Sequence, residues 1–316
     1  MVPEQKFSMR GAYGKALVEL GKTHPELVVL DADLSSSTKS GLFGKEFPDR
    51  FFQMGIAESN MIGTAVGLAS SGKKPFLHSF ACFVVGRFEV IKLAVAYNES
   101  NVAITGTHVG VGIGEDGYSQ MGTEDLGMMR ALPNVICLQP ADDVEARSAA
   151  EFLMDYEGPS YMRITRQNVY RVHDENYRFE LGRGEVLRSG TDLTLVASGA
   201  PVGYSLLAAE RLSGLGISVE VINMASIRPL DGELIAESAR KTGAVMTVED
   251  HSVRGGLGSA VCEELAERYP VPVMRTGLRE FGGSGTEADN YRIHKLDVDG
   301  ITDNARSFLE VIRNKA

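Results

Sequence analysis

The sequence has 316 residues, of which 43% are hydrophobic and 23% are charged, so it can form two folded domains and lacks the composition of a disordered chain. Its net charge of −10 argues against a nucleic-acid-binding protein, and no apolar run reaches the ~18 residues of a membrane span. Three scattered cysteines, and an N-terminus without the apolar core of a signal peptide, predict a reduced, cytoplasmic setting.

The first half of the chain alternates helical and strand-like patterns. Apolar residues at helical spacing predict helices at 9–22, 57–70, 86–97, 123–131 and from 143 onward. Short apolar runs predict strands at 28–34, 51–55, 75–80, 101–108, 134–142 and 160–166. Continuous apolar strands between helices are typical of a mostly parallel sheet covered on both faces. Ligands bind such sheets at the carboxyl ends of the strands, so the polar residues found there are the site candidates.

A polar stretch without a clear period, residues 167–183, separates the first half from a second alternation. We expect further strands at 184–190, 192–199, 218–227, 244–250 and 271–277, and helices at 201–214, 231–240, 256–268 and from about 302. The sequence therefore predicts two successive α/β domains with mostly parallel sheets. They comprise residues 1–170 and 184–316, with a linker at 171–183.

Glu58 is a single acid at the start of a helix that otherwise contains small and apolar residues (GIAESNMIG). The common interpretation is an acid that complements the helix dipole, worth less than ~1 kcal/mol. The alternative is a carboxyl group in an apolar site, where burial holds its proton more tightly than water does.

Two aromatic residues, Phe80 and Phe83, follow the strand at 75–80, and lone phenylalanines in such positions are usually core residues. The glycine-rich segment THVGVGIGEDG at 107–117 follows the next strand and contains His108 and Asp116. It lacks the GK[ST] ending of a P-loop, and no helix opens directly from it as in a dinucleotide fingerprint. By itself it indicates only a binding loop.

Two arginines lie in MRITRQN, at the last strand of the first domain. We expect Arg163 and Arg166 to share one face of this strand. Arg166, at the strand's end, suits an oxyanion or a phosphate. The alternative for both residues is a surface salt bridge.

The order and spacing of these segments are more specific than any one of them. Arg10, DADL, GIAES, FACF, THVGVGIGEDG and TRQN resemble the pyrimidine-binding domain of transketolases, and DLTLVASG, INMASIRPLD and EDHSVRGGLGSAV resemble their C-terminal domain. The chain is thus similar, over nearly its whole length, to the C-terminal subunit of a split transketolase. 1-Deoxyxylulose-5-phosphate synthase and the beta subunits of 2-oxo acid dehydrogenases are nearer relatives of that family.

This resemblance implies an enzyme that uses thiamin diphosphate to transfer a two-carbon ketol unit from a ketose donor to an aldose acceptor. Glu58 would hydrogen-bond ring nitrogen N1′ of the cofactor's aminopyrimidine and drive that ring to its imino form. Phe80 and Phe83 would pack on the ring and keep the acid's pKa raised. His108 would lie near the substrate hydroxyls, so that Glu58 and His108 are the expected catalytic residues.

The resemblance assigns further residues to the substrate. Arg10 and Arg166 would hold a distal phosphate, Asp116 would bind a substrate hydroxyl, and Ser35 to Ser37 would add hydroxyl contacts. One position departs from the family, because GEDGYSQ has Gln120 where a THQ triplet would place a histidine. Glutamine can hydrogen-bond the substrate but cannot titrate, which argues against the usual pentose phosphates. A specialised transketolase for a sulfonated or branched sugar is therefore the alternative.

The GDG…N motif, which holds the diphosphate through a metal in full-length transketolases, is absent from this sequence. The resemblance therefore implies an N-terminal partner subunit that carries this motif and holds Mg²⁺ or Ca²⁺, with no metal ligand in this chain. An α2β2 assembly acting on sugar phosphates is expected. A 2-oxo acid dehydrogenase beta subunit fits GIAESNM and GEDG less well. The intact glutamate, aromatic residues and arginines argue against a catalytically silent regulatory subunit.

Overall fold

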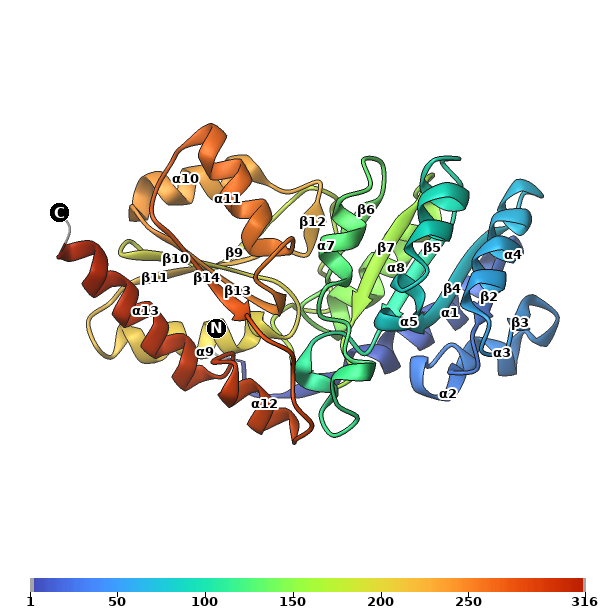
Figure 1. Cartoon of the computed structure of the whole chain (residues 1–316), viewed down its shortest axis with the longest axis horizontal. Helices are drawn as coiled ribbons and strands as arrows, with labels where there is room; N and C mark the ends of the chain where they lie inside the picture. The colour runs from blue at the N-terminus through green and yellow to red at the C-terminus, as the bar shows by residue number, and fades with distance from the viewer. Residues whose placement is uncertain (1–2, 315–316) are drawn as a thin grey trace.

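Long buried runs form the central strands, as expected for a sheet covered on both faces: every residue of β2 (Leu27–Asp31) and of β4 (Lys74–Phe80) is buried. In the computed structural model, which describes residues 3–314, two such sheets lie side by side (Figure 1). The first has the strand order β12-β6-β7-β5-β4-β2-β3, and the second has the order β14-β13-β10-β11-β9.

Neighbouring strands are parallel except at one edge of each sheet, where β12 is antiparallel to β6 and β9 is antiparallel to β11. The predicted fold class, two α/β domains with mostly parallel sheets, is confirmed. The remaining strands of the first sheet are β3 (Phe51–Gln53), β5 (Ala103–Thr107), β6 (Ile136–Leu138), β7 (Ser160–Ile164) and β12 (Ser226–Arg228).

The helices of the first domain are α1 (Met9–Thr23), α2 (Ser35–Thr38), α3 (Gly41–Glu46), α4 (Glu58–Ser70), α5 (Ala81–Val85), α6 (Phe88–Val90), α7 (Asp125–Arg130) and α8 (Asp143–Asp155). Short helical turns lie at η1 (Pro48–Arg50), η2 (Ile91–Ala96), η3 (Val111–Ile113) and η4 (Tyr118–Gln120). A separate two-stranded ribbon pairs β1 (Lys6–Ser8) with β8 (Asn168–Tyr170).

The second domain contains β9 (Glu185–Arg188), β10 (Leu193–Ala197), β11 (Val219–Asn223), β13 (Val245–Ser252) and β14 (Val273–Leu278). Its helices are α9 (Pro201–Ser213), α10 (Gly232–Thr242), α11 (Leu257–Arg268), α12 (Glu287–Ile293) and α13 (Val298–Arg313). Within residues 3–314, no helix combines the length and apolar character that crossing a bilayer requires.

Several elements differ from the sequence-based expectations. The strand predicted at 28–34 ends at Asp31, whose carboxylate accepts the Leu34 N–H at 2.6 Å and turns the chain into α2. The helix predicted at 86–97 begins at Phe88 and changes from α-helical α6 to the π-helical segment η2 at Ile91. The last helix begins at Val298 because the Asp297 side chain caps it through the Gly300 N–H.

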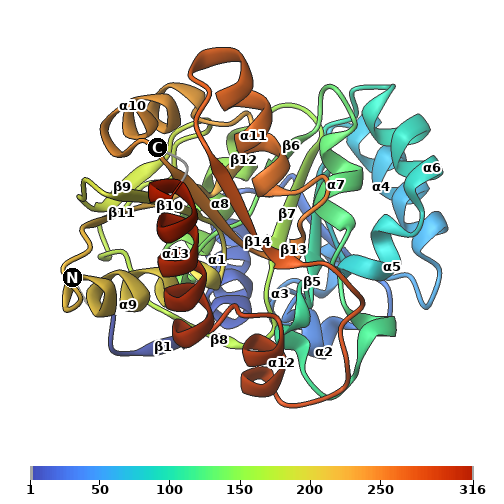
Figure 2. The ribbon, with the colours of Figure 1, turned by 60° about the vertical axis from the view of Figure 1, so that its left-hand side comes forward.

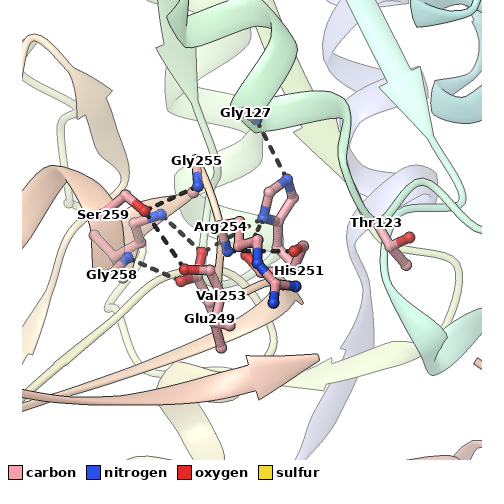
Figure 3. Close-up of polar contacts among 12 residues, drawn as sticks. Thr123, Gly127, Glu249, His251, Val253, Arg254, Gly255, Gly258 and Ser259 are labelled. Carbon is pink, nitrogen blue, oxygen red and sulfur yellow. Dashed lines mark hydrogen bonds and ion pairs between the residues drawn. The ribbon is translucent and has the colours of Figure 1, made fainter. Parts of the chain in front are cut away.

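The two domains meet at the carboxyl end of β13, which points from the second sheet toward the first domain (Figure 2). Glu249 caps α11 by accepting the N–H groups of Leu257 at 2.7 Å and Gly258 at 2.9 Å (Figure 3). Burial raises the pKa of Glu249 to about 7. His251 Nε2 accepts the N–H of Gly127 in the first domain at 3.3 Å. Together, these contacts fix the end of β13 at the junction of the domains.

Candidate active site

Most of the predicted site residues lie near the carboxyl ends of strands in the first sheet. Phe80 is the last residue of β4, His108 directly follows β5, and Arg166 lies two residues beyond β7. Parallel strands bring these ends to one edge of the sheet, where ligands bind in such folds. The sheet therefore brings together residues that are far apart in the sequence.

Arg10, in the first turn of α1, connects three segments of this edge. Its Nη1 donates to the Ser37 carbonyl at 2.5 Å, and its Nη2 donates to the Arg166 carbonyl at 2.9 Å. Nη1 also lies 3.4 Å from His108 Nε2. Burial and the neighbouring Arg166 lower the pKa of Arg10 to about 10, so it is cationic at neutral pH. Its Nε is buried without a hydrogen-bond partner among residues 3–314.

His108 is held in an uncommon backbone conformation, with φ of +60°. Its ring stacks on Phe80 with the centroids 3.6 Å apart, and its Nδ1 lies 2.9 Å from Thr107 Oγ1. Burial lowers its pKa to about 3, with a smaller contribution from Arg10 and other cations. His108 is therefore neutral at physiological pH, and it can accept or donate a hydrogen bond without carrying charge.

The predicted cofactor-binding residues lie on α4, β4 and α5. The Phe80 and Phe83 rings are stacked at 5.6 Å with an interplanar angle of 13°, and Phe83 is half-buried. Glu58 begins α4 and is 5% exposed. A buried carboxyl group and a flat apolar surface suit an aminopyrimidine ring, so these residues fit the pyrimidine end of thiamin diphosphate.

Three predicted residues are not joined to the Arg10 cluster. Within residues 3–314, no hydrogen bond or ion pair is made by the side chains of Glu58, Asp116 or Gln120. Asp116 is exposed on the glycine-rich loop, and Gln120 is half-buried at the end of η4. No group of three His, Cys, Asp or Glu side chains in this part of the chain is arranged to hold a metal ion.

A cavity of about 270 Å³ lies beside Arg10 and Arg166, and both domains line it. The second domain contributes Glu287, whose carboxylate accepts a hydrogen bond from Tyr204 at 3.2 Å and lies 3.7 Å from Lys6. Burial raises the pKa of Glu287. The full lining is Arg10, Gly112, Gly114, Glu115, Arg166, Gln167, Thr286 and Glu287.

The expectation that Arg163 and Arg166 share one face is wrong. Residues three apart on a strand lie on opposite faces, and β7 already ends at Ile164. Arg163 is fully buried and forms a two-pronged ion pair with Asp125 at 2.8 and 3.0 Å. It is a structural residue of the domain junction, whereas Arg166 is exposed and donates to the Ile113 carbonyl at 2.6 Å.

Sequence reasoning missed the residues that support the site. Thr107 contacts His108, and Asp31 accepts from the hydroxyl groups of Thr38 and Ser40, both at 2.8 Å. Glu287 belongs to a short helix with no clear periodic signal. For Thr107 and Asp31, the available signal in the sequence was their position as polar residues at the ends of strands β5 and β2.

Two protein-family models match the chain. The model described as "Transketolase, pyrimidine binding domain" matches residues 5–171, and the model described as "Transketolase, C-terminal domain" matches residues 182–301. The first match alone covers more than half of the chain.

Several relatives are similar to this chain along most of their own length. A Methanocaldococcus jannaschii protein, provisionally named a transketolase C-terminal section, is 44% identical over 93% of both chains. A subunit of the 6-deoxy-6-sulfo-D-fructose transketolase of Clostridium sp. is 41% identical, with 88% of this chain and 87% of that protein aligned. A solved split-gene transketolase, an inactive β4 tetramer, is 46% identical with a TM-score of 0.90, over 96% of this chain and 99% of that one.

Proposed function

This chain belongs to the transketolase family, and we propose that it is the C-terminal subunit of a two-chain transketolase that transfers a two-carbon ketol unit from a ketose to an aldose. The observation that carries the proposal is the Arg10 cluster, in which Arg10 contacts both His108 and Arg166 at the carboxyl edge of the sheet. A cation pair beside a neutral histidine can bind an anionic, hydroxylated substrate.

Transketolases use thiamin diphosphate and a divalent metal, and the bound cofactor would supply a nucleophilic carbon for the ketose carbonyl, which allows the adjacent carbon–carbon bond of the sugar to break. We assign Glu58 to the aminopyrimidine ring, where its buried carboxyl would share a proton with ring nitrogen N1′. Phe80 and Phe83 would orient that ring by contact with its face. These roles are supported by burial and stacking, and by the match to the pyrimidine-binding family model.

We assign His108 to a substrate hydroxyl group. Thr107 Oγ1 lies 3.4 Å from the Ser79 carbonyl, to which it donates, and so favours a proton on His108 Nδ1. The Nε2 lone pair then faces Arg10 Nη1 at 3.4 Å, and a substrate hydroxyl group would take the place of this long contact as the donor to Nε2. Arg10 and Arg166 would bind the distal anionic group of the substrate, while Asp116 and Gln120 would contact hydroxyl groups from the loop and η4.

The diphosphate and the metal would be held by an N-terminal partner subunit. Support comes from the relatives, one named as a C-terminal section and another solved as a split-gene transketolase. An α2β2 assembly is the arrangement we propose, with the cofactor between the two kinds of subunit. We place the enzyme in the cytoplasm and in carbohydrate metabolism.

A donor other than an ordinary ketose phosphate is the second candidate. Two arginines and two glutamates line the cavity at Arg10 and Arg166, so their formal charges cancel. A sulfonate carries one negative charge and a phosphate monoester close to two at neutral pH, so a lining with no net formal charge gives the phosphate no net electrostatic advantage. Gln120 and the sulfosugar relative favour the same candidate.

Co-expression with a GDG…N-containing partner, followed by a screen of ketose donors, tests the proposal. We expect two-carbon transfer to an aldose only when both chains and thiamin diphosphate are present. The ratio of kcat/KM between phosphorylated and sulfonated ketoses separates the two candidates. A purified two-chain complex that transfers no two-carbon unit from any ketose would contradict the proposed function.

A further inference from the structure

The second domain binds both polar groups of one residue in the glycine-rich loop. Asp250, on β13, accepts the N–H of Val111 at 2.8 Å. Asn290, on α12, donates its side-chain amide to the carbonyl of the same residue at 3.1 Å. Asp250 is 3% exposed and Asn290 is 1% exposed, so water cannot readily replace either contact.

Tyr291 connects this pair to Gln167, the residue after Arg166. Its hydroxyl group donates to the second carboxylate oxygen of Asp250 at 2.9 Å and accepts from Gln167 Nε2, also at 2.9 Å. Gln167 directly follows Arg166 and lines the same cavity. We call Asp250, Asn290 and Tyr291 the interdomain clamp.

Two glycines allow the clamp to approach the loop. Gly110 has φ of +73°, and a Cβ at this position would lie 2.1 Å from the Asp250 carboxyl group. A Cβ on Gly112 would lie 2.1 Å from the Gln167 amide. A side chain at Gly110 would push the loop off Asp250, and one at Gly112 would displace the Gln167 amide that donates to Tyr291. The absence of a side chain at these two glycines therefore lets the loop pack against Asp250 and Gln167 of the same chain.

The clamp rests on a fixed base. Glu249 and His251, on either side of Asp250, are held by α11 and by Gly127 of the first domain (Figure 3). Arg163 adds a contact to the Asp250 carbonyl at 3.4 Å. The loop runs from His108, which packs on Phe80, to Asp116, whose exposed side chain makes no hydrogen bond or ion pair within residues 3–314.

We propose that the interdomain clamp positions the glycine-rich loop for substrate binding, so that Asp250, Asn290 and Tyr291 set the placement of His108 and Asp116 without touching the substrate. The expected effect on donor KM rests on the proposed function, whereas the expected effect on the glycine-rich loop does not. Asp250, Asn290 and Tyr291 are positioning residues.

Hydrogen–deuterium exchange on the full chain tests the structural part. In Asp250→Ala, we expect the amides of residues 108–117 to exchange roughly tenfold faster, because one charge-assisted hydrogen bond is lost. Asp250→Asn retains an acceptor for Val111 and should restore most of the protection. Asp231→Ala is the matched control: Asp231 also accepts backbone N–H groups, of Leu234 and Gly184, but far from this loop.

Donor kinetics in the reconstituted two-chain complex test whether the clamp affects substrate binding. Asp250→Ala and Tyr291→Phe should raise the donor KM several-fold to tenfold, while hydrogen exchange at the cofactor's thiazolium carbon stays at the wild-type rate. If Asp250→Ala does not fold, Tyr291→Phe tests the clamp in both the exchange and the kinetic experiments.

Unchanged loop exchange in both Asp250→Ala and Tyr291→Phe would overturn the inference, as would a loosened loop with an unchanged donor KM. A wild-type complex with no transketolase activity would contradict the proposed function instead, and the exchange result would still decide whether the clamp holds the loop.

Discussion

Arg10 shows how much of the site depends on a single side chain. It contacts the backbone carbonyl of Ser37, the backbone carbonyl of Arg166 and the ring of His108. Both terminal nitrogens are thus occupied by backbone carbonyl groups, and the guanidinium has a fixed position before any substrate binds. A preorganised cation binds an anion with less loss of side-chain entropy.

Glu58 is the residue whose replacement should remove activity most completely. Glu58→Gln retains a hydrogen-bonding group at the start of α4 but cannot supply a proton, so we expect kcat to fall by ~10²–10⁴ with the fold intact. Steady-state assays and thermal unfolding of the reconstituted complex measure both quantities. Glu89→Gln, at an exposed first-turn acid of α6, is the control. Near-normal turnover by Glu58→Gln would disprove the proposed role.

Arg166 should discriminate between donors with and without a distal anion. Arg166→Ala removes a charge-assisted contact worth ~1.5–3 kcal/mol, so the KM for phosphorylated or sulfonated donors should rise about 10- to 100-fold. The KM for hydroxypyruvate should change much less. Arg183→Ala, at an exposed arginine, should leave both constants unchanged. An equal effect of Arg166→Ala on all donors would mean that this residue is structural.

Gln120 should affect the choice of donor and not the activation of the cofactor. Gln120→His should shift the ratio of kcat/KM between two donors by ~0.5–1.5 kcal/mol, which is a few-fold to roughly tenfold. Exchange at the thiazolium carbon should stay unchanged, because Glu58 governs it in our account. The opposite pattern, altered exchange with unaltered donor preference, would assign Gln120 to a different part of the site.

At the scale of elements, the predicted linker is tied to both domains through His173. His173 lies 3.0 Å from Asp142, the N-cap residue of α8, and 3.2 Å from Glu185 of β9. Burial opposes protonation, but the hydrogen bonds to Asp142 and Glu185 prevail and raise the pKa of His173 to about 10. A protonated histidine therefore joins the linker to a helix of one domain and a strand of the other.

Because the pKa of His173 is raised, we expect the protein to lose stability at alkaline pH. Its folded-state pKa lies above the ordinary value of ~6.5, so its contribution is complete below that pH and is lost as the pH rises through about 10. We expect His173→Gln to lower Tm by several degrees at pH 7 and by much less above pH 10. Thermal unfolding from pH 6 to 11 measures this, with His24→Gln as a partly exposed control. A Tm difference that does not depend on pH would contradict the assignment.

The elements also show what local sequence can predict. Buried strands and amphipathic helices have their own periodicity, and most of them were predicted to within a few residues. The short helix α12 and the pairing of β12 with β6 were not, because seven residues carry little periodicity and a pairing across domains leaves no local signal. Asp250 was missed for the same reason, since its partner Val111 lies 139 residues away.

At the scale of the whole molecule, the family resemblance predicted more of the site than periodicity did. It selected Arg10, Phe80, His108 and Arg166, which the structure brings into one connected cluster with Phe83. Their chemical roles, and the domain limits at residues 170 and 184, stay predictions. The side chains of Glu58, Asp116 and Gln120 make no hydrogen bond or ion pair within residues 3–314, and we propose that the ligand or the partner subunit supplies their partners.

The central claim is that this chain carries only the pyrimidine half of a cofactor site. Titration calorimetry of thiamin diphosphate with Mg²⁺ tests it directly, on the purified chain alone and on the chain with its GDG…N-containing partner. We predict no binding at micromolar cofactor by the isolated chain and micromolar or tighter binding by the pair. Micromolar binding by the isolated chain would contradict the account.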